Sequence, residues 1–250
     1  MDSDELERAV LENIEKMQAP RNCGVIEKTT PVVSFGDFTT AKIATLGINP
    51  SSAEFLTGGR LIQGEQKRLA DEEFGSASPI DIWFRCKHYF LGNPYWSWFN
   101  HLEQLLVQVG ASYKFNACHL DLSPWATDPI YSKLTSEQQK TLLEHDRDFL
   151  NWQIVESRIK TVLFNGATVY KTIEASQNYH LQKVGEISYS SGGQAKTSDL
   201  ISGDGPMGES FFGWTVNLQA LQATNEERSD LMSKLADWLK NECKVNLEEY

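Results

Sequence analysis

The chain has 250 residues with 34 acidic and 23 basic side chains, which gives a formal net charge of −11 when histidine is neutral. Hydrophobic residues make up 40% and charged residues 23%, a balance typical of a globular protein that buries its own core. No apolar run approaches the ~18 residues that span a bilayer, and the acidic N-terminal stretch is unlike a signal peptide. We therefore expect a cytoplasmic protein with no membrane partner.

The charge is unevenly distributed, and this matters for possible partners. Residues 1–18 hold six acidic and two basic residues, and residues 225–250 hold seven and four, so the intervening segment carries a net charge of only −4. Nucleic-acid-binding proteins usually have a basic balance, but exposed charges are screened beyond about 8–10 Å. DNA therefore stays open as a partner.

The cysteines lack the paired spacing of zinc or iron–sulfur sites, so we expect reduced thiols, no metal and no cofactor. They are Cys23, Cys86, Cys118 and Cys243.

Helices and strands alternate along the predicted chain. Helices are expected where apolar residues recur at helical spacing, and strands where short apolar runs end in turn residues. Residues 24–34 are expected to be extended, and residues 53–92 to be irregular with helical fragments between glycines. Residues 183–210, rich in Gly and Ser, are expected to form a hairpin or a mobile loop. The expected helices are 4–18, 95–109, 136–152, 166–175 and 226–239, and the expected strands are 41–46, 115–122, 159–164 and 211–218.

This alternation predicts an α/β fold of three α-β-α layers around a central, mostly parallel sheet of four strands. No Pro/Gly/Ser-rich linker divides the chain, so we expect one domain over 1–250, with an N-terminal helix in 1–18 and a core over 41–240. Ligands of such sheets bind beyond the carboxyl ends of the strands. The segments that follow the four strands are therefore the candidate functional segments.

The first expected strand ends in Gly47-Ile48-Asn49-Pro50-Ser51. Glycine and Asn-Pro favour turns, so a plain strand-ending turn is one interpretation. The segment also resembles the first motif of the uracil-DNA glycosylase superfamily, in the asparagine-bearing form of its mismatch-specific and single-strand-selective branches. That motif reads Gly-(Ile/Met)-Asn-Pro-Gly, so Ser51 departs from it. The resemblance implies a uracil-DNA glycosylase-like fold.

The second expected strand ends in Cys118-His119-Leu120-Asp121-Leu122-Ser123-Pro124. It resembles the base-reading strand of the same superfamily, and the resemblance implies that Asp121 replaces the asparagine that reads the pyrimidine. Strand alternation places His119 on the same face as Asp121. The alternatives are a turn acid at Asp121 and an ordinary core histidine at His119.

The remaining candidates are less specific. Asn217-Leu218-Gln219 follows the fourth expected strand and keeps the asparagine of the superfamily's third motif, but not its Pro-Ser. Leu218 is a candidate wedge into the DNA stack or a core residue, and Phe55 and Tyr95 are candidate clamps for a flipped base. Candidate phosphate contacts, or simply solvated side chains, are Arg60, Lys67, Arg68, Arg85 and Lys87.

The resemblance implies a DNA glycosylase, which we expect to be monomeric and monofunctional. Asn49 would orient water toward the sugar C1′. A carboxyl at Asp121 accepts from the cytosine amino group and, when protonated, donates to N3, which suits cytosine better than uracil. Since a cell cannot excise its own cytosine, we expect a modified base. In this the chain resembles antiphage DNA glycosylases, and the resemblance implies glucosylated hydroxymethylcytosine in phage DNA as the substrate. The alternatives are a glycosylase for uracil or another deaminated base, and a non-catalytic nucleic-acid-binding protein.

Overall fold

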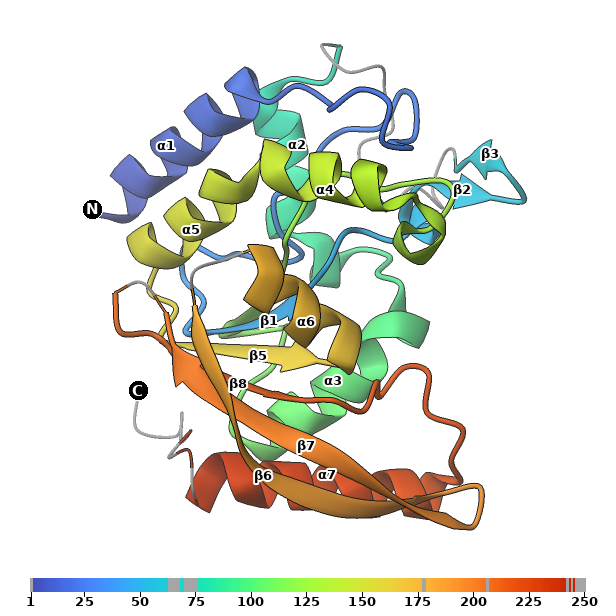
Figure 1. The fold of residues 1–250 in the computed structure, drawn as a ribbon. Coiled ribbons are helices and arrows are strands. Elements are labelled where there is room, and N and C mark those ends of the chain that lie inside the picture. The colour runs from blue at the N-terminus through green and yellow to red at the C-terminus, as the bar shows by residue number, and fades with distance from the viewer. Residues whose placement is uncertain are drawn as a thin grey trace. The chain divides into compact units, whose positions relative to one another are not determined.

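The computed structural model describes residues 2–62, 68–69, 76–176, 179–205, 207–241, 243 and 245. The fold is α/β, with a central mixed but mostly parallel sheet in the order β4-β1-β5-β8-β7-β6. Figure 1 labels the strands of this sheet except β4. A separate pair consists of β2 (Leu56–Thr57) and β3 (Arg60–Leu61). The strands of the central sheet are β1 (Ile43–Gly47), β4 (Ala117–Asp121), β5 (Thr161–Asn165), β6 (His180–Ser191), β7 (Gln194–Asp204) and β8 (Ser210–Trp214).

The central sheet has six strands, so the expectation of four is wrong. The four expected strands are present as β1, β4, β5 and β8, and the two additional ones form the hairpin of β6 and β7. Gly192 and Gly193 join these two strands with φ of 61° and 74°, the left-handed values that a tight two-residue hairpin turn requires. The hairpin extends the sheet because β7 pairs antiparallel with β8 and buries Leu200 and Ile201.

One expected helix is two helices in the structure. The segment predicted as 136–152 contains α4 (Ser136–His145) and α5 (Arg147–Glu156). Asp146 separates them, with φ −116° and ψ 24°, and its carboxylate accepts hydrogen bonds from Trp125 Nε1 at 2.7 Å and His145 Nδ1 at 3.0 Å. The other helices are α1 (Ser3–Lys16), α2 (Pro79–Lys87), α3 (Trp96–Gln108), α6 (Ala167–Ser176) and α7 (Asn225–Asn241), and 3-10 turns lie at Ser52–Glu54 (η1), Tyr89–Leu91 (η3) and Tyr131–Lys133 (η4).

The chain divides into two compact units. The first comprises residues 1–41, 47–95 and 118–158, and the second comprises 42–46, 96–117 and 159–250. In the first unit α1 packs against α2, and the buried Phe38 ring forms T-shaped pairs with Trp83 and Trp152. In the second unit α7 packs against α3 and β6. The segments after β1 and β4 both belong to the first unit, which therefore holds the first and second motifs named in the sequence analysis.

None of the helices within the described ranges is long and apolar enough to cross a membrane.

Candidate functional site

The segments that follow β1 and β4 are joined by backbone hydrogen bonds. The amides of Leu122 and Ser123 donate to the carbonyls of Gly47 and Ile48 at 3.2 and 2.9 Å. Gly47 is the point of closest approach, because a Cβ there would lie 2.3 Å from Asp121 Oδ1 and 2.9 Å from His119 Nε2. Only glycine admits the Asp121 and His119 side chains at this distance. The structure thus brings the first two predicted motifs into one site.

Asn49 is held in a single orientation by two acceptors. Its Nδ2 donates to the Trp125 carbonyl at 3.0 Å and to Thr127 Oγ1 at 3.2 Å. Trp125 and Thr127 are 0% and 1% exposed, so these acceptors are part of a packed wall. Both amide protons are therefore used, and Oδ1 accepts no hydrogen bond from any residue within the described ranges. The half-buried side chain of Asn49 presents this oxygen as an oriented acceptor.

Asp121 and His119 form the polar pair beside Gly47. His119 Nε2 lies 3.4 Å from Asp121 Oδ1, and both side chains are only 4% exposed. Their shared face agrees with strand alternation. The His119 ring also packs against Phe35, with centroids 5.6 Å apart, and the His119 and Phe35 backbones exchange two hydrogen bonds of 2.8 and 2.9 Å. The His119 ring is therefore held by Phe35 as well as by its own strand, β4.

A buried carboxyl that sequence reasoning missed lies in the same unit. Glu54, in η1, is 2% exposed, and its Oε2 accepts a hydrogen bond of 2.7 Å from the Tyr89 hydroxyl. Burial raises the pKa of Glu54 to about 7 against the lowering effects of the Tyr89 hydrogen bond and of Arg68, and the charge of Asp121 raises it further. The only sequence signal is an acid between the small Ala53 and a large apolar residue, which does not distinguish burial from exposure.

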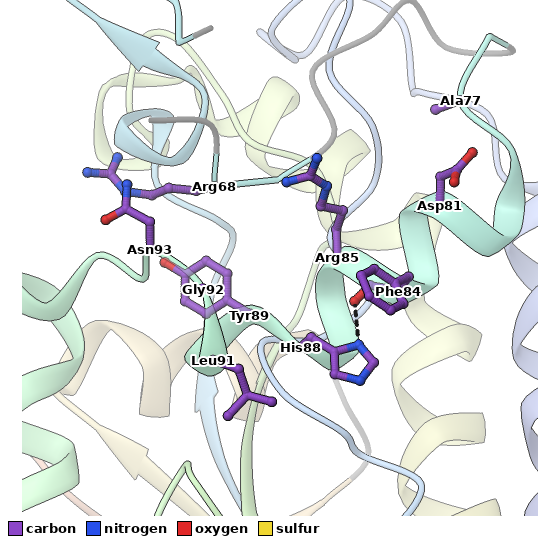
Figure 2. Close-up of a pocket in the computed structure, with 10 residues that line it drawn as sticks. All are labelled: Arg68, Ala77, Asp81, Phe84, Arg85, His88, Tyr89, Leu91, Gly92 and Asn93. Atoms are coloured by element: carbon purple, nitrogen blue, oxygen red, sulfur yellow. Dashed lines mark hydrogen bonds between the residues drawn. The ribbon is translucent and has the colours of Figure 1, made fainter. Parts of the chain in front are cut away.

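Tyr89 connects this carboxyl to a pocket. The Tyr89 hydroxyl accepts a hydrogen bond from the Tyr95 amide at 2.8 Å, and the Tyr95 ring lies 5.1 Å from the Arg68 guanidinium carbon. Arg68 Nη1 also donates to the Ala53 carbonyl. Tyr89 and Arg68 both line an open pocket of about 720 Å³, which Figure 2 shows with α2 and the loop before α3. Tyr95, a candidate clamp for a flipped base, and Arg68, a candidate phosphate contact, therefore stack on each other at this pocket.

The rest of the first motif is structural in this conformation. Pro50 is buried and Ile48 is half-buried. Ser51 has φ −67° and ψ 142°, which any residue adopts, and its hydroxyl caps η1 by accepting from the Ala53 amide at 3.2 Å. The departure from glycine at Ser51 is therefore compatible with the turn. Phe55 is 1% exposed, so it packs in the core.

The candidate phosphate contacts separate into different places. Arg85 lines the same pocket as Arg68, and Arg60 is exposed on β3. Lys87 instead forms ion pairs with Glu7 and with Asp37. Lys67 lies outside the described residues.

The third motif belongs to the second unit. Asn217 is exposed, and its Oδ1 accepts from the amides of Gln219 and Ala220 at 3.0 and 3.3 Å, so it closes its own turn. Leu218 is 0% exposed and is a core residue here. Sequence reasoning gave no role to Asn165, whose Oδ1 accepts from Trp214 Nε1 at 2.7 Å and from the Leu218 amide at 3.0 Å. Asn165 thereby fixes the loop that follows β8.

The donor chemistry of the site is that of amides, carboxyls and an imidazole. Within the described ranges, no group of three or more His, Cys, Asp or Glu side chains is arranged to hold a metal ion. The side chains of Asn49, Asp121 and His119 can hold water and donate to or accept from a polar ligand, and buried Glu54 can store a proton.

Comparison with known proteins adds no family. No protein-family model matches this chain, and no curated protein matches it.

Proposed function

We propose that this protein is a DNA glycosylase with a uracil-DNA glycosylase-like fold. Its substrate would be a modified cytosine, and glucosylated hydroxymethylcytosine in phage DNA is our first candidate. Excision would leave an abasic site in the phage DNA and would serve antiviral defence. The observation that carries the proposal is Asn49, whose amide protons are both taken by Trp125 and Thr127. This leaves Oδ1 as a fixed acceptor beside the segment that carries Asp121.

In the proposed reaction the target nucleotide is flipped out of the DNA stack and into the site. Asn49 Oδ1 accepts a hydrogen bond from water and holds that water toward C1′ of the sugar. The bond from C1′ to the base nitrogen breaks, and its electron pair leaves on the base. The water oxygen bonds to C1′ and releases a proton to solvent. Because an asparagine is a weak base, most of the rate enhancement comes from placement and electrostatics around an oxocarbenium-like sugar.

Asp121 is proposed to read the base and to assist its departure. A carboxyl group accepts from the exocyclic amino group of cytosine and, in its protonated form, donates to N3. Uracil presents the opposite pattern at these two positions, and a mismatch of buried polar edges costs a few kcal/mol. The burial of the Asp121 side chain, 4% exposed, supports this discrimination because little water can repair a mismatch.

The proposal is tested with oligonucleotides that contain one uracil, cytosine, hydroxymethylcytosine or glucosylated hydroxymethylcytosine. Each is incubated with the protein and then treated with alkali, which breaks the strand at abasic sites. We expect breaks in the modified-cytosine strand. Breaks confined to the uracil strand would make the protein a repair glycosylase, and binding without breaks on any strand would make it non-catalytic.

A matched pair of variants separates catalysis from folding. Asn49→Ala removes the oriented oxygen, whereas Asn241→Ala makes the same change at an exposed position at the end of α7. We expect Asn49→Ala to lose strand breakage by about a hundredfold or more, as removal of an oriented polar group at a reacting centre does. Asn241→Ala should retain the wild-type rate.

A further inference from the structure

The pocket shared by Tyr89 and Arg68 combines basic groups with exposed apolar side chains. Its volume is about 720 Å³, and Phe84 and Leu91, which line it, are 60% and 73% exposed. Figure 2 shows Phe84, Arg85 and His88 on α2 and at its end, with Leu91 and Asn93 following in the chain. A large aromatic residue left this exposed beside arginine indicates a surface that is covered when a ligand binds.

The charged groups of the pocket favour an anion. Arg85 is exposed and makes no ion pair with another residue in the described part of the chain. The Arg68 guanidinium is anchored by the Ala53 carbonyl and the Tyr95 ring, so its position is set before a ligand arrives. The acid that lines the pocket, Asp81, accepts a hydrogen bond of 2.5 Å from the Ser78 hydroxyl at the start of α2.

The aromatic group specifies the kind of anion. His88 packs against one side of Phe84 with ring centroids 4.4 Å apart, and its Nδ1 lies 3.0 Å from the Phe84 carbonyl oxygen. The Phe84 ring is thus held in place although 60% of the residue is exposed. Paired bases in duplex DNA stack on each other and offer no free face, whereas an unpaired base can stack on an aromatic ring. Arginine recognises the adjoining phosphate.

We propose that this pocket binds an unpaired nucleotide of single-stranded DNA, with the base on Phe84, one flanking phosphate at Arg85 and the other at Arg68. That the ligand is DNA rests on the proposed function. A strand bound in this pocket would pass beside Tyr89, whose hydroxyl donates to Glu54. The pocket therefore holds a nucleotide that flanks the one to be excised, and the protein prefers unpaired strands.

The test is a fluorescence anisotropy titration with an unmodified, labelled thymidine oligomer of about ten nucleotides, within the usual site sizes of single-strand binders. Phe84→Ala should weaken binding by about tenfold, the typical loss of one stacked base. Arg85→Ala should reduce the slope of log K against log salt by about 0.7, the value for one phosphate of a single strand. The matched controls are Ile80→Ala, 62% exposed on the same helix, and the exposed Arg158→Ala, neither of which lines the pocket.

The competitors distinguish the sources of an anion. We expect the single strand to be displaced by another single strand, and weakly by duplex, inorganic phosphate, thymidine monophosphate or poly-glutamate. Equal competition by the monophosphate or by phosphate would make this a small-anion pocket, and equal competition by duplex or poly-glutamate would overturn the single-strand assignment. If Phe84 and Arg85 prove dispensable while the oligonucleotide panel still shows base excision, this inference fails and the proposed function stands. If the single strand binds as expected but no base is excised from any oligonucleotide, the proposed function fails and the binding of a single strand in this pocket stands.

Discussion

The buried carboxyl of Glu54 makes a direct prediction about stability against pH. Burial raises the pKa of Glu54 from 4.5 to about 7. Between about pH 4.5 and pH 7, the folded state therefore keeps a proton on Glu54 that the unfolded state has released. Stability from this group is therefore fully present below about pH 4.5 and is lost as the pH rises through about 7. The two pKa values correspond to about 3 kcal/mol of stability lost above neutrality.

Glu54→Gln removes this titration while keeping an oxygen that accepts from the Tyr89 hydroxyl at the same position. We expect the variant and the wild type to have similar free energies of unfolding near pH 5, and the variant to be more stable by up to about 3 kcal/mol near pH 8. Urea unfolding followed by tryptophan fluorescence at several pH values measures the difference.

The control is an exposed carboxyl with the same kind of partner. Glu174 on α6 accepts a hydrogen bond of 3.1 Å from the Tyr170 hydroxyl but is exposed. Glu174→Gln should therefore leave the pH profile of stability unchanged. If Glu54→Gln also leaves the pH profile of stability unchanged, or lowers stability by the same amount at every pH, the reasoning that burial keeps Glu54 protonated is refuted.

Three further changes test the packing and the chemistry of the site. Gly47→Ala places a methyl group 2.3 Å from Asp121 Oδ1, so we expect the loss of base excision in the oligonucleotide assay, and retained activity would refute the close approach. Gly213→Ala places a methyl 2.1 Å from the Phe164 ring, and thermal unfolding should show a loss of about 1–3 kcal/mol that Gly185→Ala, 3.8 Å from its nearest neighbour, does not share. Asp121→Asn should shift the ratio of excision from modified cytosine toward uracil by about tenfold or more, and an unchanged ratio would exclude Asp121 as the reader.

Much of the sheet was predictable because four of its six strands, β1, β4, β5 and β8, are short apolar runs followed by turn residues. The hairpin was left open as an alternative because residues 183–210 are rich in Gly and Ser, a composition that also suits a loop, and β6 is exposed or half-buried along almost its whole length. The break at Asp146 was missed because the apolar spacing continues on both sides of it. The structure shows the Asp146 carboxylate bound by Trp125 and His145 at this break, and the Trp125 contact joins residues 21 positions apart, which the sequence does not reveal.

The site was predictable to the extent that it follows the strand ends. Gly47, Asn49 and Asp121 come together because the segments after β1 and β4 share backbone hydrogen bonds. Glu54 and Tyr89 could not be foreseen, since they lie 35 positions apart and the burial of a carboxyl depends on what packs over it. Sequence likewise cannot show that Leu218, a candidate wedge, is fully buried.

The most direct test of the account is the detection of a free base. Chromatography with mass detection follows an oligonucleotide carrying glucosylated hydroxymethylcytosine after incubation with the wild type and with Asn49→Ala. The account predicts release of the intact modified base by the wild type, in amounts equal to the abasic sites formed, and little release by the variant. Equal release by both proteins, or none by the wild type from any modified cytosine, would contradict it.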